Sequence, residues 1–332
     1  MEQYSYITNL SKYPFQDIYV TKLLLFYDNE DHALELTTCD SADWGMPSTL
    51  VVKTSETFPL PLRLEMRWIS PAERKVFEIA KSLDQARTED LWKKQKNDYP
   101  DNPFRQYMIG VAPYGGVAIW LCNSKKSVFV QWLQAEEKPL VLDEDDEAVL
   151  GGSQETLNAM MPLDKLQNNM RQHHYRFVPL EEYFDSEGWQ KYSVGDGFYE
   201  AIELDGVEVK RLDGTFDYTD CDDVLHYHEA GKPCRITVRW YEGDSSFFAH
   251  FWLDETETTF FFNGFSNTFP DAQADLLLRI DRRAERYEIA LTGEGLPTRT
   301  MKHAQYVVFK DYVEISRSKN YTKKDGEWRW FS

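Results

Sequence analysis

The sequence predicts a mainly β protein of the α+β class, with two β-rich domains, antiparallel sandwich-like sheets and two or three short helices. Two observations carry this prediction. Apolar and polar residues alternate in many short segments rich in aromatic and β-branched residues, and Gly, Asp or Pro residues separate these segments. The chain has 332 residues, enough for two domains. We expect the first domain over residues 1–192 and the second over 193–332.

The first hundred residues contain a predicted hairpin, a strand and a helix. Residues 17–27 and 32–38 flank a polar turn and are typical of a β-hairpin. In Leu62–Ile69, apolar and charged residues alternate, which indicates a strand with one buried face. Residues 84–96 have a helical pattern that ends before Pro100, because the residue before proline avoids the helical conformation.

A second hairpin and two further segments follow. Residues 108–112 and 117–122 are predicted strands joined by a tight turn of Pro, Tyr and two Gly residues, and residues 128–133 extend the sheet. The acidic stretch 143–147 has no packing periodicity and is predicted to be a loop. Residues 156–174 have helical spacing.

The second half repeats the pattern of short aromatic-rich strands. We expect strands at 197–204, 207–210, 235–241, 246–253, 258–262, 287–291 and 306–309, and a short helix at Ala274–Ile280. One segment of the first half is echoed here. Pro61–Trp68 and Pro233–Trp240 both begin with proline, alternate apolar and polar positions, and end in Arg-Trp. This echo leads to the hypothesis that one β-rich unit is duplicated.

Two acidic segments hold the net charge of the chain, which is −19. Residues 136–155 contain eight acids and one base, and residues 181–229 contain fifteen acids and three bases. Such localised charge focuses an electric field toward a basic partner, although a solvated loop and a solvated face are the alternative. The candidate partner-binding residues are Asp143, Glu144, Asp145, Asp146, Glu147, Asp220, Asp222 and Asp223.

Composition argues against several classes of protein. The excess of acids opposes nucleic-acid binding and adsorption to anionic membranes, since both need clustered Lys and Arg. No apolar run approaches the ~18 residues of a membrane span. Residues 1–5 lack the basic and apolar regions of a signal peptide, and the four cysteines form no Cys-x-x-Cys pair. We therefore expect a cytoplasmic protein with reduced thiols and no membrane insertion.

The sequence contains no catalytic signature, and we expect a protein that is not an enzyme and needs no cofactor. The motifs of serine hydrolases, zinc proteases, P-loop enzymes and dinucleotide-binding enzymes are absent. One group of residues offers zinc ligands, although its spacing is not that of a standard structural site: Cys221, His226, His228 and Cys234. A surface loop with two histidines and unpaired cysteines is the alternative interpretation of this group.

Aromatic residues of the second half offer a different function. Phe247, Phe248, Phe251, Trp252, Phe260, Phe261, Phe262 and Phe265 could line a platform for a glycan or a small molecule on the predicted strands. Core packing is the commoner use of such residues. A ligand-binding module is therefore the alternative function.

Residues 13–192 resemble a known bacterial family. The segment Gly110–Leu121 resembles its most distinctive motif, a G-x-A-P-G-G-x-V-x-x-W hairpin, although Tyr114 is inserted here before the glycine pair. Pro61–Trp68, Gln134–Glu137 and Trp189–Tyr192 follow the order of the same family. The family is the domain of unknown function numbered 2931.

The resemblance implies no enzymatic activity and no catalytic residues. Many relatives carry a lipoprotein leader, whereas Cys39 of this chain has no lipobox before it. Some relatives are encoded near contact-dependent or type VI secretion loci. Together with the acidic segments, this context leads us to expect an immunity-type protein that binds a basic toxin.

Overall fold

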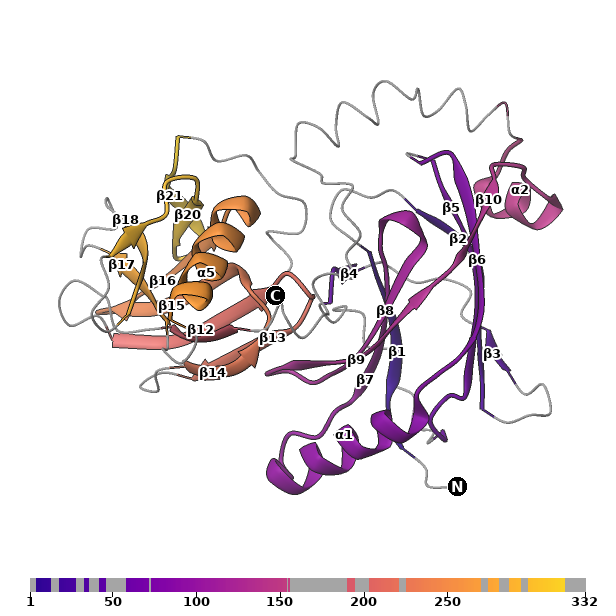
Figure 1. Cartoon of the computed structure of the whole chain (residues 1–332), viewed down its shortest axis with the longest axis horizontal. Helices are drawn as coiled ribbons and strands as arrows, with labels where there is room; N and C mark the ends of the chain where they lie inside the picture. Colours follow the sequence, from indigo (N-terminus) through magenta and orange to yellow (C-terminus); the bar gives the residue numbers. More distant parts are fainter. Residues whose placement is uncertain are drawn as a thin grey trace. The chain divides into compact units, whose positions relative to one another are not determined.

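The fold is described from a computed structural model. It describes residues 4–12, 18–27, 33–35, 42–45, 58–71, 73–153, 155, 190–194, 203–220, 225–269, 274–280, 287–293 and 298–319. The chain divides into two compact units, residues 1–181 with 325–332 (unit 1) and residues 182–324 (unit 2), which Figure 1 draws. The described residues form four sheets, so the mainly β class is confirmed. The predicted domain boundary, between residues 192 and 193, falls inside strand β11 (Gln190–Val194) of unit 2.

Unit 1 contains two five-stranded sheets. The first has the strand order β4-β1-β7-β8-β9, and β1 runs parallel to both of its neighbours. The second has the order β10-β6-β5-β2-β3 with antiparallel pairing. The strands are β1 (Ile7–Lys12), β2 (Tyr19–Phe26), β3 (Ala33–Glu35), β4 (Ala42–Asp43), β5 (Arg63–Ser70), β6 (Lys75–Ser82), β7 (Gln106–Val111), β8 (Gly116–Cys122), β9 (Ser127–Gln134) and β10 (Glu136–Pro139).

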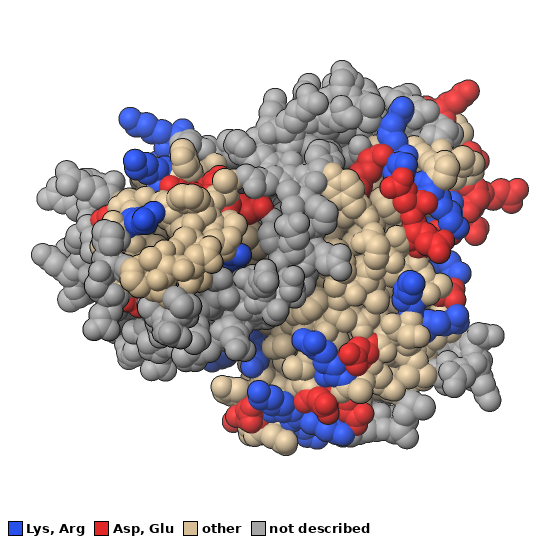
Figure 2. All heavy atoms as spheres, viewed as in Figure 1, with Lys and Arg blue, Asp and Glu red and all other residues tan. Residues whose placement is uncertain are grey.

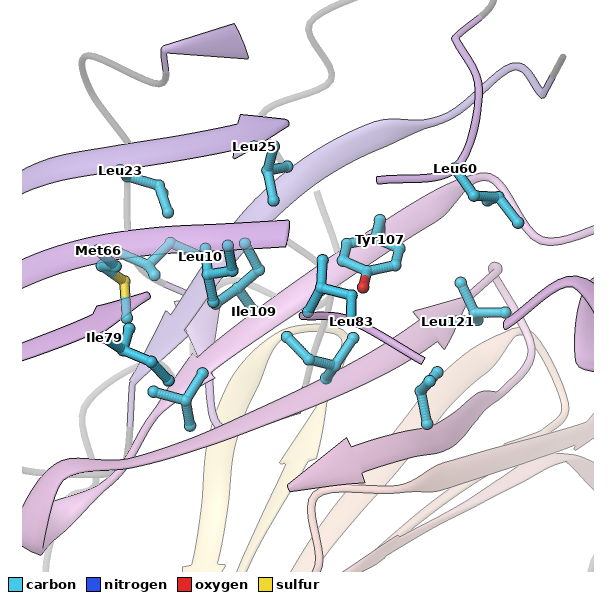
Figure 3. Packing of buried hydrophobic residues seen from close by; sticks show 14 of the residues in the cluster. Leu10, Leu23, Leu25, Leu60, Met66, Ile79, Leu83, Tyr107, Ile109 and Leu121 are labelled. Carbon is cyan, nitrogen blue, oxygen red and sulfur yellow. The ribbon is translucent and has the colours of Figure 1, made fainter. Parts of the chain in front are cut away.

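The two sheets of unit 1 share one hydrophobic core. Alternation along β5 buries Leu64, Met66 and Trp68 and turns Arg63 and Arg67 away from this core. Figure 3 shows core side chains from both sheets, among them Leu10, Leu23, Leu25, Met66, Ile79, Tyr107, Ile109 and Leu121. The sandwich-like packing and the strand predicted from the alternation are both confirmed.

One helix of unit 1 joins two of its strands, and another follows its last described strand. Helix α1 (Gln85–Asp98) follows β6, as predicted, and the side chain of Asp84 caps it by accepting a hydrogen bond from the backbone N–H of Arg87 at 2.9 Å. Helix α2 (Glu144–Leu150) follows β10. The loop predicted for residues 143–147 is therefore wrong, because Asp143 caps a short helix there.

Unit 2 contains a five-stranded sheet of order β14-β11-β17-β18-β19 and a six-stranded sheet of order β13-β12-β15-β16-β20-β21. Its core also lies between the sheets, with residues from β12, β15 and β16 facing residues from β17 and β18. Besides β11, the strands are β12 (Glu203–Arg211), β13 (Phe216–Asp220), β14 (Leu225–Ala230), β15 (Pro233–Glu242), β16 (Ser245–Trp252), β17 (Ala274–Ile280), β18 (Tyr287–Thr292), β19 (Arg299–Thr300), β20 (Gln305–Lys310) and β21 (Val313–Arg317).

Two predicted elements of unit 2 are wrong. The strand expected at residues 258–262 is part of helix α5 (Glu255–Thr268), which Asp254 caps through the N–H of Glu257 at 2.9 Å. The helix expected at Ala274–Ile280 is strand β17, in which buried and half-buried residues alternate. The predicted helix at residues 156–174 lies outside the described residues.

The two units share most of their topology, although the edge strand β4 pairs in parallel with β1 whereas β14 pairs antiparallel with β11. In both, the first strand pairs in parallel with the strand after the helix, β1 with β7 and β11 with β17. The second sheet of unit 1 contains the strand order β10-β6-β5-β2, and the second sheet of unit 2 contains the equivalent order β20-β16-β15-β12. Trp68 stacks on Phe77 and Trp240 stacks on Phe247, each with ring centroids 5.3 Å apart. The echoed segments Pro61–Trp68 and Pro233–Trp240 thus lead into equivalent strands, β5 and β15.

Candidate functional site

Helix α2 is held on the outer face of a unit 1 sheet by apolar side chains. Ile69 of β5 and Val76 of β6 form a small cluster on the face opposite to the main core. Leu140, Leu142 and Leu150, which flank or end α2, pack against this cluster. Apolar contacts therefore attach the helix to the sheet at both of its ends.

An ion pair beneath α2 completes this attachment. The Arg67 guanidinium donates to the Asp146 carboxylate through Nε (3.0 Å) and Nη2 (2.5 Å). Asp146 is fully buried, and the Arg67 side chain is 17% exposed. Burial acts to raise the pKa of Asp146, but hydrogen bonds from Arg67 and the backbone of Asp143 outweigh it and hold the pKa below its usual value. Asp146 therefore serves the fold.

The other acids around α2 reach solvent, although Asp143 also forms an ion pair with Arg67, with 3.3 Å between Oδ2 and Nη2. Asp143, Glu144, Asp145 and Glu147 are exposed, and two exposed valines accompany them, Val141 at 69% and Val149 at 52%. Figure 2 shows the red spheres of acidic residues over the position of α2 in Figure 1. We call these four acids and two valines the α2 surface. The sequence analysis did not predict helix α2. Two signals for it were present in the sequence: Asp143 and Asp146 form a capping box, and Gly151 ends the helix in a left-handed conformation.

Strand β10, which leads into α2, carries paired charges. Glu137 forms an ion pair with Lys75, and Lys138 forms one with Glu78. Glu78 also accepts from Arg67, and the hydrogen bonds from Lys138 and Arg67 lower the pKa of Glu78 despite its partial burial. Glu137 and Glu78 are therefore balanced by neighbouring bases, while Glu136 on the same strand is exposed and adds to the negative charge of this region.

The glycine-rich hairpin of unit 1 is explained by packing. Val111, the last residue of β7, and Gly116, the first of β8, flank the turn η1 (Pro113–Gly115), in which Tyr114 has a φ of 59°. The N–H of Tyr114 donates to Glu73 Oε1 at 2.7 Å, which holds this strained residue. A Cβ on Gly116 would lie 2.3 Å from the Trp132 ring.

Gly110 on β7 gives a test of this packing. We expect Gly110→Ala to destabilise unit 1 by about 1–3 kcal/mol, because the added Cβ would lie 2.3 Å from the Trp120 ring and 2.8 Å from the Trp44 ring. Urea unfolding measures the change. Gly264→Ala is the control, and it is expected to stabilise the chain by about 0.5–1 kcal/mol because Gly264 lies in an exposed helix. An unchanged midpoint for Gly110→Ala would contradict the packing argument.

The hairpin and the strands around it lie within a segment that matches a known family. Residues 8–176 match the model of the family described as "Protein of unknown function (DUF2931)". The chain belongs to this family. The match covers half of the chain, and no curated protein and no solved structure matches it. In the part of the chain that the structure describes, no helix is long and apolar enough to cross a membrane.

The second acidic segment lies in unit 2, beyond the DUF2931 match. Asp220 is the last residue of β13, and Asp222 and Asp223 lie outside the described residues. Other acids of this segment form ion pairs within unit 2: Asp217 with Arg211, Glu208 with Arg235 and Asp205 with Arg239. Part of the charge that the sequence concentrates here is therefore neutralised locally.

The proposed zinc ligands are divided between two sheets. His226 and His228 are on β14, whereas Cys234 is on β15 of the other sheet of unit 2, and Cys221 lies outside the described residues. Burial raises the pKa of the Cys234 thiol to about 11, which opposes the thiolate that zinc needs. Across the described ranges, no three His, Cys, Asp or Glu residues gather as a metal site.

The aromatic residues of unit 2 line its interior more than its surface. Phe247, Phe251 and Phe262 belong to the core, and Phe248 is also buried. Phe260–Phe262 lie on helix α5 and not on a strand, so the expected aromatic strand platform is not formed by these residues. Phe260 is the exception, with 65% of its surface exposed.

Proposed function

We propose that this DUF2931 protein is a non-enzymatic binding protein of the immunity type, whose α2 surface contacts a basic toxin. The observation that carries the proposal is the fixed placement of three exposed carboxylates, Glu144, Asp145 and Glu147, on one helix that is anchored by Arg67 and Asp146. A basic partner meeting this surface gains favourable long-range attraction before contact. The type VI or contact-dependent secretion loci near which some family members are encoded support the same proposal.

The two valines of the α2 surface favour a protein partner over a merely solvated helix. A helix kept only for solubility has no need of apolar side chains among its acids, whereas protein interfaces combine apolar contact area with a charged rim. Val141 and Val149 both stand in solvent beside the acids. Because α2 is already held in place, little conformational entropy is lost on binding.

The first experiment identifies the partner. Tagged full-length protein is used to capture proteins from the native host at low salt, and the bound fraction is eluted at high salt. The proposal expects one basic protein in the eluate, because salt screens attraction between exposed charges. Capture of no protein, or of one retained equally at high salt, contradicts the proposal.

Charge reversal then tests the surface. We expect Glu144→Lys, Asp145→Lys and Glu147→Lys together to slow association with the captured partner by at least about tenfold at low salt, and to flatten its salt dependence. Association rates are measured by surface plasmon resonance. Glu89→Lys, Asp90→Lys and Asp98→Lys together, on α1, change the net charge by the same amount and should leave most of the rate intact. Equal losses in both variants would show that only net charge matters.

A further inference from the structure

Two arginines occupy equivalent positions in the two units, Arg67 on β5 and Arg239 on β15. Each directly precedes the tryptophan that stacks on a phenylalanine of the next strand. Each also lies opposite the residue that follows a register shift in the neighbouring strand, Lys22 of β2 or Gly206 of β12. Alternation turns both arginines to the outer face of their sheet, away from the core. Their surroundings can therefore be compared directly.

The two arginines meet their carboxylates in different ways. In unit 1 the carboxylate comes from helix α2, whose Asp146 is fully buried against Arg67. In unit 2 it comes from Asp205 of β12, the residue at the register shift, with 3.6 Å between its Oδ2 and Nη1 of Arg239. The Arg239 side chain is 34% exposed, against 17% for Arg67. Because a guanidinium has five donors, the exposed part of Arg239 is accessible to a second acceptor.

The chain also leaves the two sheets differently. In unit 1, β10 leads into α2, and Leu140 and Leu142 pack on the outer face of the sheet beside this helix. In unit 2, the equivalent strand β20 ends in a tight turn at Asp311 and Tyr312, and the chain returns as β21 (Figure 1). An edge strand thus follows β20, where a helix follows β10.

Aromatic side chains lie around Arg239 on the outer face. Phe248 of β16 is directly opposite Arg239, and the Tyr312 ring lies near that of Phe248, with centroids 5.9 Å apart. Tyr241 follows two residues after Arg239 on the same face of β15. Tyr312 is 61% exposed and Tyr241 is 44% exposed. We call Arg239, Tyr241 and Tyr312 the Arg239 surface.

The turn that presents Tyr312 is strained. Asp311 and Tyr312 have φ angles of 48° and 66°, in the left-handed region that two-residue hairpin turns usually fill with Asn and Gly. Asp311 is held in place by the backbone N–H of Ser246, which donates to its carboxylate at 2.9 Å. Such strain concentrates at functional positions. The exposed ring, and not the geometry of the turn, accounts for a tyrosine at position 312.

We propose that the Arg239 surface binds an amphipathic helix of a partner protein. One carboxylate of that helix pairs with Arg239, and its apolar side chains pack on Tyr241 and Tyr312. Unit 1 supplies the precedent, because α2 is held over the equivalent arginine by one buried carboxylate and by flanking leucines. Recognition of a helix through a few anchor residues on its apolar face is a common mode of protein binding.

The acids around the Arg239 surface define the rest of the partner. Glu242, Asp244 and Asp311 are exposed in the turns next to it. They favour a helix whose other residues are basic or neutral, and they disfavour one as acidic as α2. A second copy of this chain is disfavoured for the same reason, since its net charge is −19. The Arg239 surface lies in unit 2, so this proposal does not depend on the function proposed for the α2 surface.

A model peptide tests the proposal on the full-length protein. The probe is a helical peptide of about 14 residues with leucines and a single aspartate on one face and lysines elsewhere. Isothermal titration calorimetry at about 150 mM NaCl should show saturable binding, with a dissociation constant below about 1 mM. Binding should weaken at least about tenfold for Arg239→Ala, and equally for a peptide with asparagine in place of the aspartate. Non-specific attraction of a basic peptide to an acidic chain predicts the opposite, because both changes strengthen that attraction.

Two further variants separate binding from folding. Arg317→Ala removes an arginine that is also exposed and paired with an acid, Glu314, and should leave binding unchanged. Tyr312→Gly relaxes the left-handed turn, so it should not lower the urea midpoint of unfolding, but it should weaken peptide binding at least about fivefold. Absence of saturable binding up to about 1 mM peptide overturns the proposal. Binding that Arg239→Ala does not weaken also overturns it, because the peptide then occupies another surface.

Discussion

Arg67→Ala is expected to destabilise unit 1 by about 3–5 kcal/mol. The substitution leaves the fully buried carboxylate of Asp146 without its bidentate partner, and it removes a donor to Glu78. It also removes the polar part of the attachment of α2 to the sheet, while the apolar contacts of Leu140, Leu142 and Leu150 remain. Urea unfolding measures the loss, and hydrogen exchange in peptides from β5 and α2 assigns it to unit 1.

Two further variants define the cause of that loss. Arg63→Ala on the same strand removes an arginine that is 42% exposed and paired with Glu65, so it should cost no more than about 1 kcal/mol. Arg67→Met combined with Asp146→Leu replaces both charges by apolar groups and should recover most of the stability. A cost for Arg67→Ala as small as that for Arg63→Ala would show that the pair does not anchor α2.

Acid is expected to destabilise unit 2 through His250. Its ring is 2% exposed, lies beside Phe248 and Phe309, and bonds through Nδ1 to Thr237 Oγ1 at 2.9 Å. Burial, with a smaller contribution from Arg235, lowers its pKa from 6.5 to about 3. Between these values the unfolded chain binds the proton and the folded chain does not, so stability falls as pH falls. The expected loss is about 3 kcal/mol between pH 7 and pH 4.

The measurement compares urea unfolding of the wild type and of His250→Gln across this pH range. Glutamine does not titrate, so the variant should lose less stability on acidification. Asp213, buried in the same unit, has a pKa raised by burial and acts in the opposite sense, so only the difference between the two proteins reports on His250. His303→Gln, at an exposed histidine, is the control. Identical pH slopes for wild type and His250→Gln would refute the assignment.

Alternation predicts a strand well where the strand has one buried face, as β5 does; β8, by contrast, is buried at every position. In β5 the buried positions 64, 66 and 68 alternate with charged residues, and the pattern is visible without any knowledge of the partner strands. The same reasoning failed for α5, whose three consecutive phenylalanines favour a strand by propensity. Two features favour the helix instead: Asp254 caps it, and Thr258 and Phe262, four residues apart, are buried on the same face.

The candidate site was only partly accessible from the sequence. The acids of the α2 surface stand out as a run of charge, but the sequence treats Asp146 like its neighbours. Its partner Arg67 is 79 residues away and carries no local signal, so the division of the run into one buried and four exposed acids depends on the tertiary structure. Asp222 and Asp223 remain predictions from the sequence alone.

The parallel strand pairs constrain how the chain folds as it is made. Ile7 of β1 pairs with Gln106 of β7, and Tyr192 of β11 pairs with Ala274 of β17. During synthesis, the earlier strand of each pair leaves the ribosome long before its main partner exists. Closing such long loops costs entropy before the contacts form, which slows folding and leaves strand edges open for association. The time at which each sandwich closes is therefore governed by the order of synthesis as well as by its final packing.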